Sequence, residues 1–243
     1  MNPEKSPWYV QAFGSLYSLV YSHRSDEAAA TEVAFVLRHV QLAPGARILD
    51  LACGNGRHVR ALSCAGYSAV GMDLSRDLLQ EAGQSGTFVR ADMRTIPFAD
   101  ESFGAVMSFF TSFGYFKDSD EDLAVLNEAR RVLIPEGWFL LDFLRAESVT
   151  SNLVPRSERV VKDLRITEER RIEDNNVMKR VRVVREDGEK LLDYEESVRL
   201  YEQEEIGNMI AGAGMEIVDW FGDFEGAQTD AGSRLIALAK RGP

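Results

Sequence analysis

Short apolar runs alternate with amphipathic segments through the first 145 residues of the chain. Each run has the length of a buried strand, and apolar positions at helical spacing separate one run from the next. Because alternating strands and helices form parallel sheets covered on both faces, the pattern predicts an α/β fold with a twisted, mostly parallel sheet. The expected strands occupy residues 48–51, 68–73, 86–92, 104–110 and 138–143.

The pattern changes after residue 145. Between residues 146 and 200 charged residues become dense and alternate with apolar ones, and Asn175-Asn176 and Asp187-Gly188 are typical of tight turns. We expect about three antiparallel strands here, inserted into the α/β domain. A sheet with one apolar face needs a cover. The insertion is therefore predicted to cover a site or to form a dimer surface.

Residues 201–243 return to the α/β pattern. A helix is expected from the acidic residues 202–205, and two closing antiparallel strands are expected at 215–220 and 233–239. These strands complete a seven-stranded sheet. The chain is thus predicted to divide into residues 1–145, an antiparallel insertion at 146–200, and the closing elements at 201–243.

Aromatic side chains follow one face of the N-terminal segment. Residues 7–21 are predicted to form an amphipathic helix, and Ser25 is predicted to cap a second helix. The aromatic face has two interpretations of equal weight. The first is ordinary packing against the core, and the second is a lid over a bound ligand.

Charge and cysteine usage restrict the partners. The formal net charge of −11 disfavours nucleic acid and anionic membranes as partners. The N-terminus lacks a signal-peptide pattern and no apolar run could span a bilayer, so a cytoplasmic location is expected. Cys53 and Cys64 lie close in sequence, which disfavours a structural disulfide. Cys53 could be a reactive thiol, but a small side chain packed at a turn is the favoured interpretation.

The stretch around residues 47–73 contains the clearest candidate binding site. The first strand ends at a turn with Gly54 and Gly56, and a helix follows. Glycines allow a close ligand approach, and a helix N-terminus offers free N–H groups. Asp73 ends the second strand roughly 20 residues further on, where nucleotide-binding units hold ribose hydroxyls. The unit therefore predicts a ligand that contains a ribose.

The same turn disfavours a nicotinamide dinucleotide. The dinucleotide fingerprint has a third glycine, which this chain lacks after Gly56. Asp50 also ends the first strand, and its carboxylate would repel a pyrophosphate but stabilise an amino or sulfonium cation. A Rossmann oxidoreductase is therefore the weaker alternative.

Residues 50–58, Asp-Leu-Ala-Cys-Gly-Asn-Gly-Arg-His, resemble the first motif of class I S-adenosylmethionine-dependent methyltransferases. Gly-Met-Asp-Leu-Ser at 71–75 resembles the second motif, and residues 131–137 resemble the sequence that precedes the fifth strand. Segments 17–24, 92–94 and 111–116 are similar to small-molecule, amino-sugar N-methyltransferases of bacteria. The resemblance implies a Rossmann-like fold, S-adenosyl-L-methionine as cofactor, and a small-molecule methyl acceptor.

The resemblance also implies which residues hold the cofactor. Asp73 would bind the ribose, and Asp92 would accept a hydrogen bond from the adenine amino group. His58, beside the glycine turn, would contact the cofactor. The full expected set is Tyr17, Arg24, Asp50, Ala52, Gly54, Gly56, His58, Asp73, Leu74, Asp92, Met93 and Phe109.

The chemistry of methyl transfer is less constrained by the sequence. The three histidines, at 23, 39 and 58, are all N-terminal, which excludes a histidine base from the second half of the fold. Tyr115 is the candidate catalytic residue, which would steer the acceptor or accept its proton. No metal site is expected, and both nitrogen and oxygen acceptors remain open. A protein that binds S-adenosylmethionine without turnover is the alternative, and a homodimer through the insertion is a further expectation.

Overall fold

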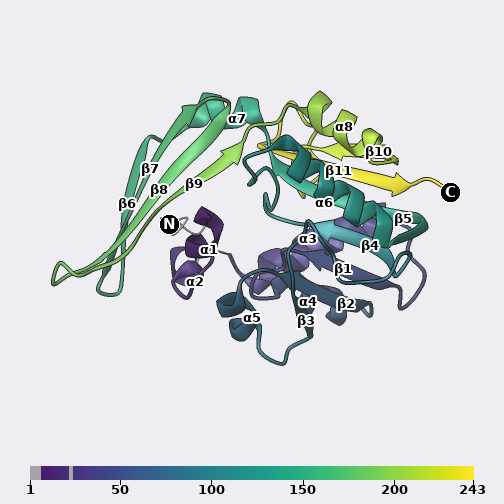
Figure 1. Ribbon diagram of the computed structural model, residues 1–243, viewed down its shortest axis with the longest axis horizontal. Coiled ribbons are helices and arrows are strands. Elements are labelled where there is room, and N and C mark those ends of the chain that lie inside the picture. Colours follow the sequence, from purple (N-terminus) through teal and green to yellow (C-terminus); the bar gives the residue numbers. More distant parts are fainter. Residues whose placement is uncertain (1–6, 22–23) are drawn as a thin grey trace, which may run out of the picture.

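The computed structural model describes residues 7–21 and 24–243. Within them, two sheets lie side by side and are bridged by N-terminal helices (Figure 1). The strand order of the larger, seven-stranded sheet is β10-β11-β5-β4-β1-β2-β3. Its strands are β1 (Arg47–Leu51), β2 (Ser68–Asp73), β3 (Thr87–Arg90), β4 (Phe103–Ser108), β5 (Leu133–Leu144), β10 (Met215–Phe221) and β11 (Arg234–Arg241).

Strands β1 to β5 pair in parallel with their neighbours among these five, and β11 pairs antiparallel with both β5 and β10. This arrangement confirms the predicted mostly parallel, seven-stranded sheet. The helices that accompany it are α3 (Asp26–His39), α4 (Arg57–Cys64), α5 (Arg76–Ala82), α6 (Ser119–Val132) and α8 (Gln203–Gly212).

Alternate residues of the central strands serve two separate cores. Ile48 of β1 packs with Val36 of α3 and Leu62 of α4, whereas Leu49 packs with Leu126 of α6 and the apolar side of α8. Because successive side chains of a strand point to opposite faces, a strand buried on both sides must be apolar throughout. Asp50 interrupts that rule, since its carboxylate is 1% exposed.

Residues 134–137, which precede the expected fifth strand at 138–143, lie inside β5. Leu133 pairs with Phe103, but Trp138 pairs with Ala105, so β5 bulges between these two positions. Glu136 takes a left-handed conformation there, with φ of 61°. Pairing with β4 resumes on the same strand after the bulge.

The insertion forms a four-stranded antiparallel sheet, one strand more than expected. It contains β6 (Arg156–Val161), β7 (Leu164–Glu173), β8 (Asn176–Arg185) and β9 (Lys190–Arg199), and α7 (Ala146–Asn152) precedes it. The β7–β8 turn is tight because Asp174 and Asn175 both have positive φ, at 47° and 58°.

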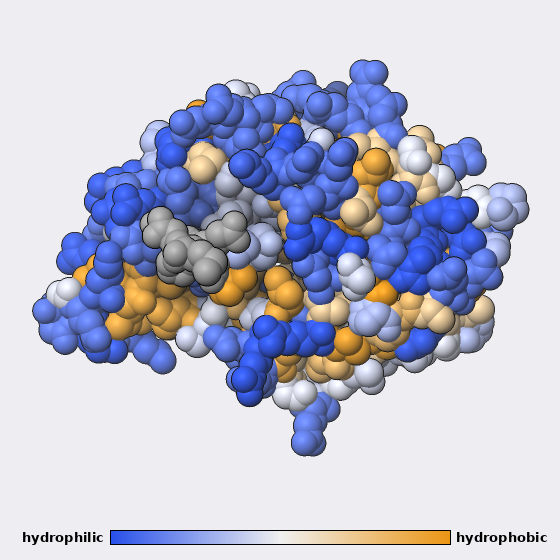
Figure 2. Space-filling model, viewed as in Figure 1, coloured by the Kyte–Doolittle hydropathy of each residue, from blue (hydrophilic) through white to orange (hydrophobic). Residues whose placement is uncertain are grey.

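The predicted N-terminal helix is broken into α1 (Trp8–Ala12) and α2 (Tyr17–Val20), which lie between the two sheets (Figure 1). Ala12 and Val20 pack against Ile166, Val181 and Tyr194 on the inserted sheet. The inner side of that sheet, toward α2, shows apolar surface, whereas its outer edge is hydrophilic (Figure 2). The N-terminal helices thus cover the apolar face that the sequence left without a partner.

Candidate functional site

The glycine turn after β1 depends on left-handed backbone. Ala52, Gly54 and Gly56 have φ of 60°, 55° and 78°. A Cβ on Gly56 would lie 2.6 Å from the ring of Phe88, so that position has no room for a side chain. A Cβ on Gly54 would meet nothing nearer than Leu78, at 3.9 Å. Gly54 is therefore open toward a ligand, whereas Gly56 serves close packing at the start of α4.

Asp73 is fixed against this turn at the carboxyl end of β2. One carboxylate oxygen accepts a hydrogen bond from the Gly54 amide at 2.8 Å, and the other accepts from the Ser75 amide at 2.8 Å. Burial raises the pKa of Asp73, and these amide donors counteract it. The carboxylate is held in one orientation and faces a cavity beside Leu74.

The cavity has a volume of about 400 Å³ and lies across the carboxyl ends of the parallel strands. The N-terminal helix α1 forms one wall with Tyr9 and Phe13. The Tyr115 ring lies on the same side, 5.1 Å from the Trp8 ring and 5.8 Å from the Phe13 ring. Eight of the predicted residues line this cavity, namely Tyr17, Ala52, Gly54, Asp73, Leu74, Asp92, Met93 and Tyr115.

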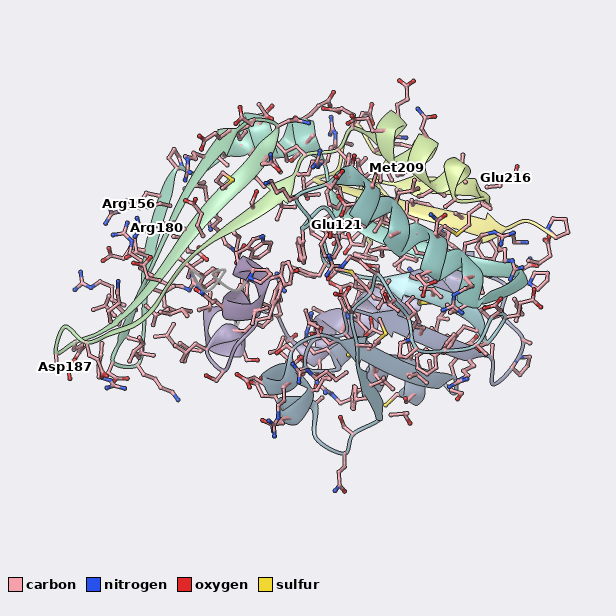
Figure 3. The ribbon with its side chains drawn as sticks, in the orientation of Figure 1. Glu121, Arg156, Arg180, Asp187, Met209 and Glu216 are labelled. Atoms are coloured by element: carbon pink, nitrogen blue, oxygen red, sulfur yellow. The ribbon has the colours of Figure 1, made fainter. Side chains whose placement is uncertain are left out.

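Asp92 follows β3 and is paired with Arg94 at 2.6 Å. The hydrogen bonds from Arg94 lower the pKa of Asp92, which keeps the carboxylate ionised. Arg94 also pairs with Glu121 on the first turn of α6 (Figure 3) and lies 4.4 Å above the Phe116 ring. An ionised carboxylate next to an aromatic cavity wall can accept a hydrogen bond from an amino group.

A second cavity of about 280 Å³ adjoins the first and shares Tyr17, Ala52, Gly54 and Ser112 with it. Two guanidinium groups, of Arg24 and Arg57, line this cavity. Arg24 donates a hydrogen bond to the Tyr17 hydroxyl and lies 3.6 Å above the Phe110 ring. The side of the second cavity that Arg24 and Arg57 line is therefore suited to bind an anionic group.

Asp50 lies in β1 just before the turn, lines neither of the two cavities, and has an unsatisfied oxygen. Its Oδ2 is buried and has no hydrogen-bond partner among the described residues. Burial raises the pKa of Asp50 to about 6, although the nearby His58 lowers it. Since a buried carboxylate without a partner is costly, this site is better suited to a cationic ligand than to a phosphate.

The structure constrains the expected role of His58, which stays a prediction. Its Nε2 lies 2.6 Å from a carboxylate oxygen of Glu32, and its ring stacks on Phe109 at 3.9 Å. Both His58 and Phe109 line the second cavity as a buried pair. Glu32, 26 residues away in the sequence, occupies Nε2, so a contact between His58 and a cofactor would have to use the rest of the ring.

The structure also limits Tyr115. Burial raises the pKa of its hydroxyl well above the ordinary value, so the phenol keeps its proton at neutral pH. Of the two roles considered, accepting a proton is disfavoured and steering the acceptor stays a prediction. Burial likewise raises the pKa of Cys53, whose thiol packs at the turn, and this favours the structural interpretation over a reactive thiol.

Several polar side chains near the exit of the inserted sheet and on α3 lie away from the cavities. Tyr201 donates a hydrogen bond to buried Asp122 at 2.8 Å, and Arg199 donates to the Lys117 carbonyl, so neither reaches the site. His39 contacts Phe35 and Phe221 at the end of α3. His23 lies outside the described residues. Sequence reasoning missed Arg57 and Phe110, because only the fold brings Arg24 over the Phe110 ring.

Within residues 7–21 and 24–243, no cluster of three or more metal-ligating side chains occurs. In the same part of the chain, no helix is both long and apolar enough to cross a membrane.

A glycine turn after β1, an acid that ends β2 and an acid after β3, all at one cavity, define the class I S-adenosylmethionine-dependent methyltransferase fold. Residues 48–137 match the family model described as a methyltransferase domain. The chain thus contains a methyltransferase domain of this class, as predicted.

Curated relatives agree with this class. The putative methyltransferase YqeM of Bacillus subtilis is 33% identical over 138 residues, which are 54% of this chain and 54% of the relative. A dTDP-3-amino-3,4,6-trideoxy-alpha-D-glucopyranose N,N-dimethyltransferase of Streptomyces venezuelae is 29% identical, over 63% of this chain and 68% of the relative. The chain spans about half the length of YqeM.

Solved structures extend the similarity of the fold to nearly the whole chain. The CcbJ methyltransferase from Streptomyces caelestis has a TM-score of 0.80 at 19% identity and covers 96% of this chain and 99% of its own. S-adenosylmethionine-bound CalS10, an amino pentose methyltransferase from Micromonospora echinaspora, has a TM-score of 0.72 at 19% identity, over 93% and 96% of the two chains. These similarities confirm the predicted fold with its inserted sheet.

Proposed function

We propose that the protein transfers the methyl group of S-adenosylmethionine to a nitrogen of a small-molecule acceptor. The observation that carries this proposal is the pair of acids at the glycine turn. Asp73 is oriented by two backbone amides toward the larger cavity, and Asp50, in β1 just before the turn, keeps a buried oxygen without a partner among the described residues. A ribose diol and a cation are the groups that these two carboxylates would stabilise.

The two joined cavities fit the two halves of the cofactor. Asp73 would accept hydrogen bonds from the ribose hydroxyls, and Asp92 with Met93 would hold the adenine in the larger cavity. Arg24 with Tyr17 would bind the methionine carboxylate in the second cavity. Asp50 lies in β1, outside the lining of both cavities, and would stabilise the positive charge of the cofactor from there. Gly54 lies where the cavities meet and leaves space for the cofactor.

The cofactor supplies an activated methyl group on its sulfonium when bound. The side chains therefore need to orient the acceptor and exclude water, and orientation alone can supply roughly 7–11 kcal/mol. The aromatic side chains Trp8, Phe13 and Tyr115 close one side of the site. Tyr115 is placed to orient the acceptor with a neutral hydroxyl.

A nitrogen acceptor is favoured over a hydroxyl. A neutral amine already carries the lone pair that attacks the methyl group, whereas a hydroxyl needs a base. Burial raises the pKa of Tyr17, Tyr21 and Tyr115, so these phenols do not act as bases at neutral pH. Two of the curated relatives carry names that describe dTDP-amino-sugar N,N-dimethyltransferases, which supports this choice of acceptor atom.

Other parts of the proposal concern organisation. We retain the division into residues 1–145, 146–200 and 201–243, a cytoplasmic location, and no nucleic-acid partner as predictions. A homodimer through the insertion also stays a prediction. Light scattering after size-exclusion chromatography would test the dimer, and a monomer at all concentrations would contradict it.

Titration calorimetry with S-adenosylhomocysteine tests the function first. We expect micromolar or tighter binding to the full chain. Methyl transfer from S-adenosylmethionine to a panel of amines and alcohols then separates an enzyme from a protein that only binds the cofactor. Absence of S-adenosylhomocysteine binding by folded protein would contradict the proposal, and turnover with alcohols alone would contradict the choice of nitrogen.

A further inference from the structure

Four polar side chains meet on the inner face of the inserted sheet, the face toward α2. The carboxylate of Glu196 on β9 lies 2.9 Å from the ammonium of Lys179, its cross-strand neighbour on β8. It also accepts hydrogen bonds from Tyr21 at 2.8 Å and from Tyr194 at 3.1 Å. We call Glu196, Lys179, Tyr194 and Tyr21 the inner-face cluster.

The inner-face cluster is connected to the second cavity through Tyr21. Tyr21 lines that cavity, and its ring lies 4.6 Å from the Tyr17 ring. The Arg24 guanidinium lies 4.3 Å from the same Tyr21 ring and donates a hydrogen bond to Tyr17. The position of Tyr21 therefore determines how Arg24 and Tyr17 face the cavity.

The link between the inner-face cluster and the second cavity depends on the negative charge of Glu196. The ammonium of Lys179 lies 4.6 Å from the Tyr21 ring, so two cations, Lys179 and Arg24, contact one aromatic ring. Lys179 and Glu196 are 15% and 13% exposed, and water screens such a pair only weakly. Without Glu196, Lys179 would be an uncompensated, largely buried cation beside Arg24. The charge of Glu196 also contributes to the pKa of Tyr17, after burial and Arg24.

We propose that Glu196 is a positioning residue for the amino-acid end of the cofactor. By neutralising Lys179 and holding Tyr21, it keeps the Arg24–Tyr17 pair aimed into the second cavity. No residue of the inserted sheet lines either cavity. Through Glu196, the sheet nevertheless takes part in cofactor binding. This inference rests on the proposed function.

Calorimetry on Glu196→Gln with two ligands tests the inference. S-adenosylhomocysteine carries the amino-acid end, whereas 5′-methylthioadenosine lacks it. We expect S-adenosylhomocysteine to bind about tenfold more weakly to the variant, the equivalent of one lost charge-assisted contact. We expect 5′-methylthioadenosine to bind within about twofold of wild type, because Asp73 and Asp92 are untouched. A merely structural defect would weaken both ligands together.

A matched control lies one residue away. Glu195 is on the outer face of the same strand, where it pairs with Arg171 at 2.6 Å, and the neighbouring Arg180 points away from the N-terminal helices (Figure 3). Glu195→Gln removes the same charge from the protein but should leave both affinities unchanged. The double variant Glu196→Gln with Lys179→Met also removes the uncompensated charge of Lys179. It should recover most of the lost affinity for S-adenosylhomocysteine.

Each outcome bears on a separate claim. Wild-type protein that binds neither ligand overturns the proposed function and this inference with it. Wild-type binding with Glu196→Gln unchanged, or with both ligands weakened equally, overturns only the inference. Where Glu196→Gln fails to fold, Tyr21→Phe keeps the ring but removes its hydrogen bond, and a selective loss of S-adenosylhomocysteine affinity again supports the proposal. An unchanged Tyr21→Phe overturns it.

Discussion

The two acids at the glycine turn show how position decides what a carboxylate can do. Asp73 is a satisfied acceptor, because the Gly54 and Ser75 amides both donate to it. Asp50 is buried more deeply than Asp73, at 1% exposed, and keeps an oxygen without a partner among the described residues. The first is therefore oriented before a ligand arrives, and the second is stabilised only when a cation arrives.

Replacing Asp73 by alanine should weaken cofactor binding. The variant loses the ribose contacts and frees the Gly54 amide, and hydrogen bonds to charged groups contribute about 1.5–3 kcal/mol each. We expect the affinity for S-adenosylhomocysteine to fall at least tenfold in calorimetry. Asp187→Ala, at the exposed tip of the β8–β9 hairpin (Figure 3), is the control and should bind normally. Unchanged affinity in Asp73→Ala would contradict the proposal that Asp73 binds the ribose.

Asp50 should make cofactor binding depend on pH. Its pKa is raised to about 6 by burial, so the ligand-free protein carries a neutral Asp50 below that pH. We expect affinity for S-adenosylhomocysteine to fall by up to about tenfold between pH 7 and pH 5, because a proton must leave for each cation bound. Asp50→Asn should show a flat profile over the same range. A wild-type profile as flat as that of Asp50→Asn would contradict the cation site.

The same pKa shift has a consequence for stability. Because the folded pKa lies above the ordinary value of 3.8, Asp50 contributes stability below that value, and this contribution is lost as the pH rises through 6. A bound cation opposes the loss. The increase in melting temperature caused by S-adenosylhomocysteine should therefore be larger at pH 7 than at pH 5.

At the scale of elements, the strand–turn–helix unit separates two roles for glycine. Gly54 faces open space between the cavities, whereas Gly56 caps α4 with its Cα against Phe88. Both have positive φ, but only at Gly56 does an added side chain also collide with the core. Sequence alone shows two similar glycines, and packing distinguishes them.

The two glycines predict opposite phenotypes. Gly56→Ala should destabilise the fold strongly, through left-handed strain of about 1–2 kcal/mol and the clash with Phe88. Gly54→Val carries left-handed strain as well, at φ of 55°, but no clash with the core, so it should destabilise the fold less than it weakens cofactor binding. Urea unfolding and S-adenosylhomocysteine calorimetry on both variants would measure this. A Gly54→Val variant that binds the cofactor normally would contradict the role of the turn.

At the scale of the whole molecule, a buried contact ties the inserted sheet to the site. Asp122 on α6 accepts hydrogen bonds from the Tyr201 hydroxyl at 2.8 Å and from the Gly114 amide at 3.2 Å. Gly114 also accepts from the Arg199 amide at 2.9 Å, where β9 ends. The loop after β4 and the exit of the insertion therefore share one carboxylate.

Tyr201→Phe tests this contact. Loss of the hydroxyl leaves the Asp122 carboxylate short of a donor, which should cost about 1–3 kcal/mol of unfolding free energy in urea titration. The pKa of Asp122, which burial already raises to about 6, should rise further because the Tyr201 hydrogen bond lowers it. The stability difference between variant and wild type should therefore be smaller at pH 4 than at pH 8. An equal stability difference at both pH values would show that the ionisation of Asp122 does not cause the destabilisation.

The sequence by itself determined what local order can specify. Apolar runs, glycines and strand-end acids occur in consecutive order, so the parallel sheet, the turn at 52–56 and the roles proposed for Asp73 and Asp92 could be read from the chain. The helix cap at Ser25 was equally local, and its side chain accepts the hydrogen bond of the Ala28 amide. The bulge in β5 and the fourth strand of the insertion were not readable, because strand pairing decides them.

Tertiary structure alone decided which side chains are available at the site. The Nε2 atom of His58 is paired with Glu32, and Tyr115 was considered as a base but is held protonated by burial. Glu196 lies 175 residues from Tyr21, yet the two form one hydrogen bond beside the second cavity. Hydrogen bonding, charge pairing and desolvation depend on interatomic distances and on burial in the folded structure. Spacing along the chain determines neither the distances nor the burial.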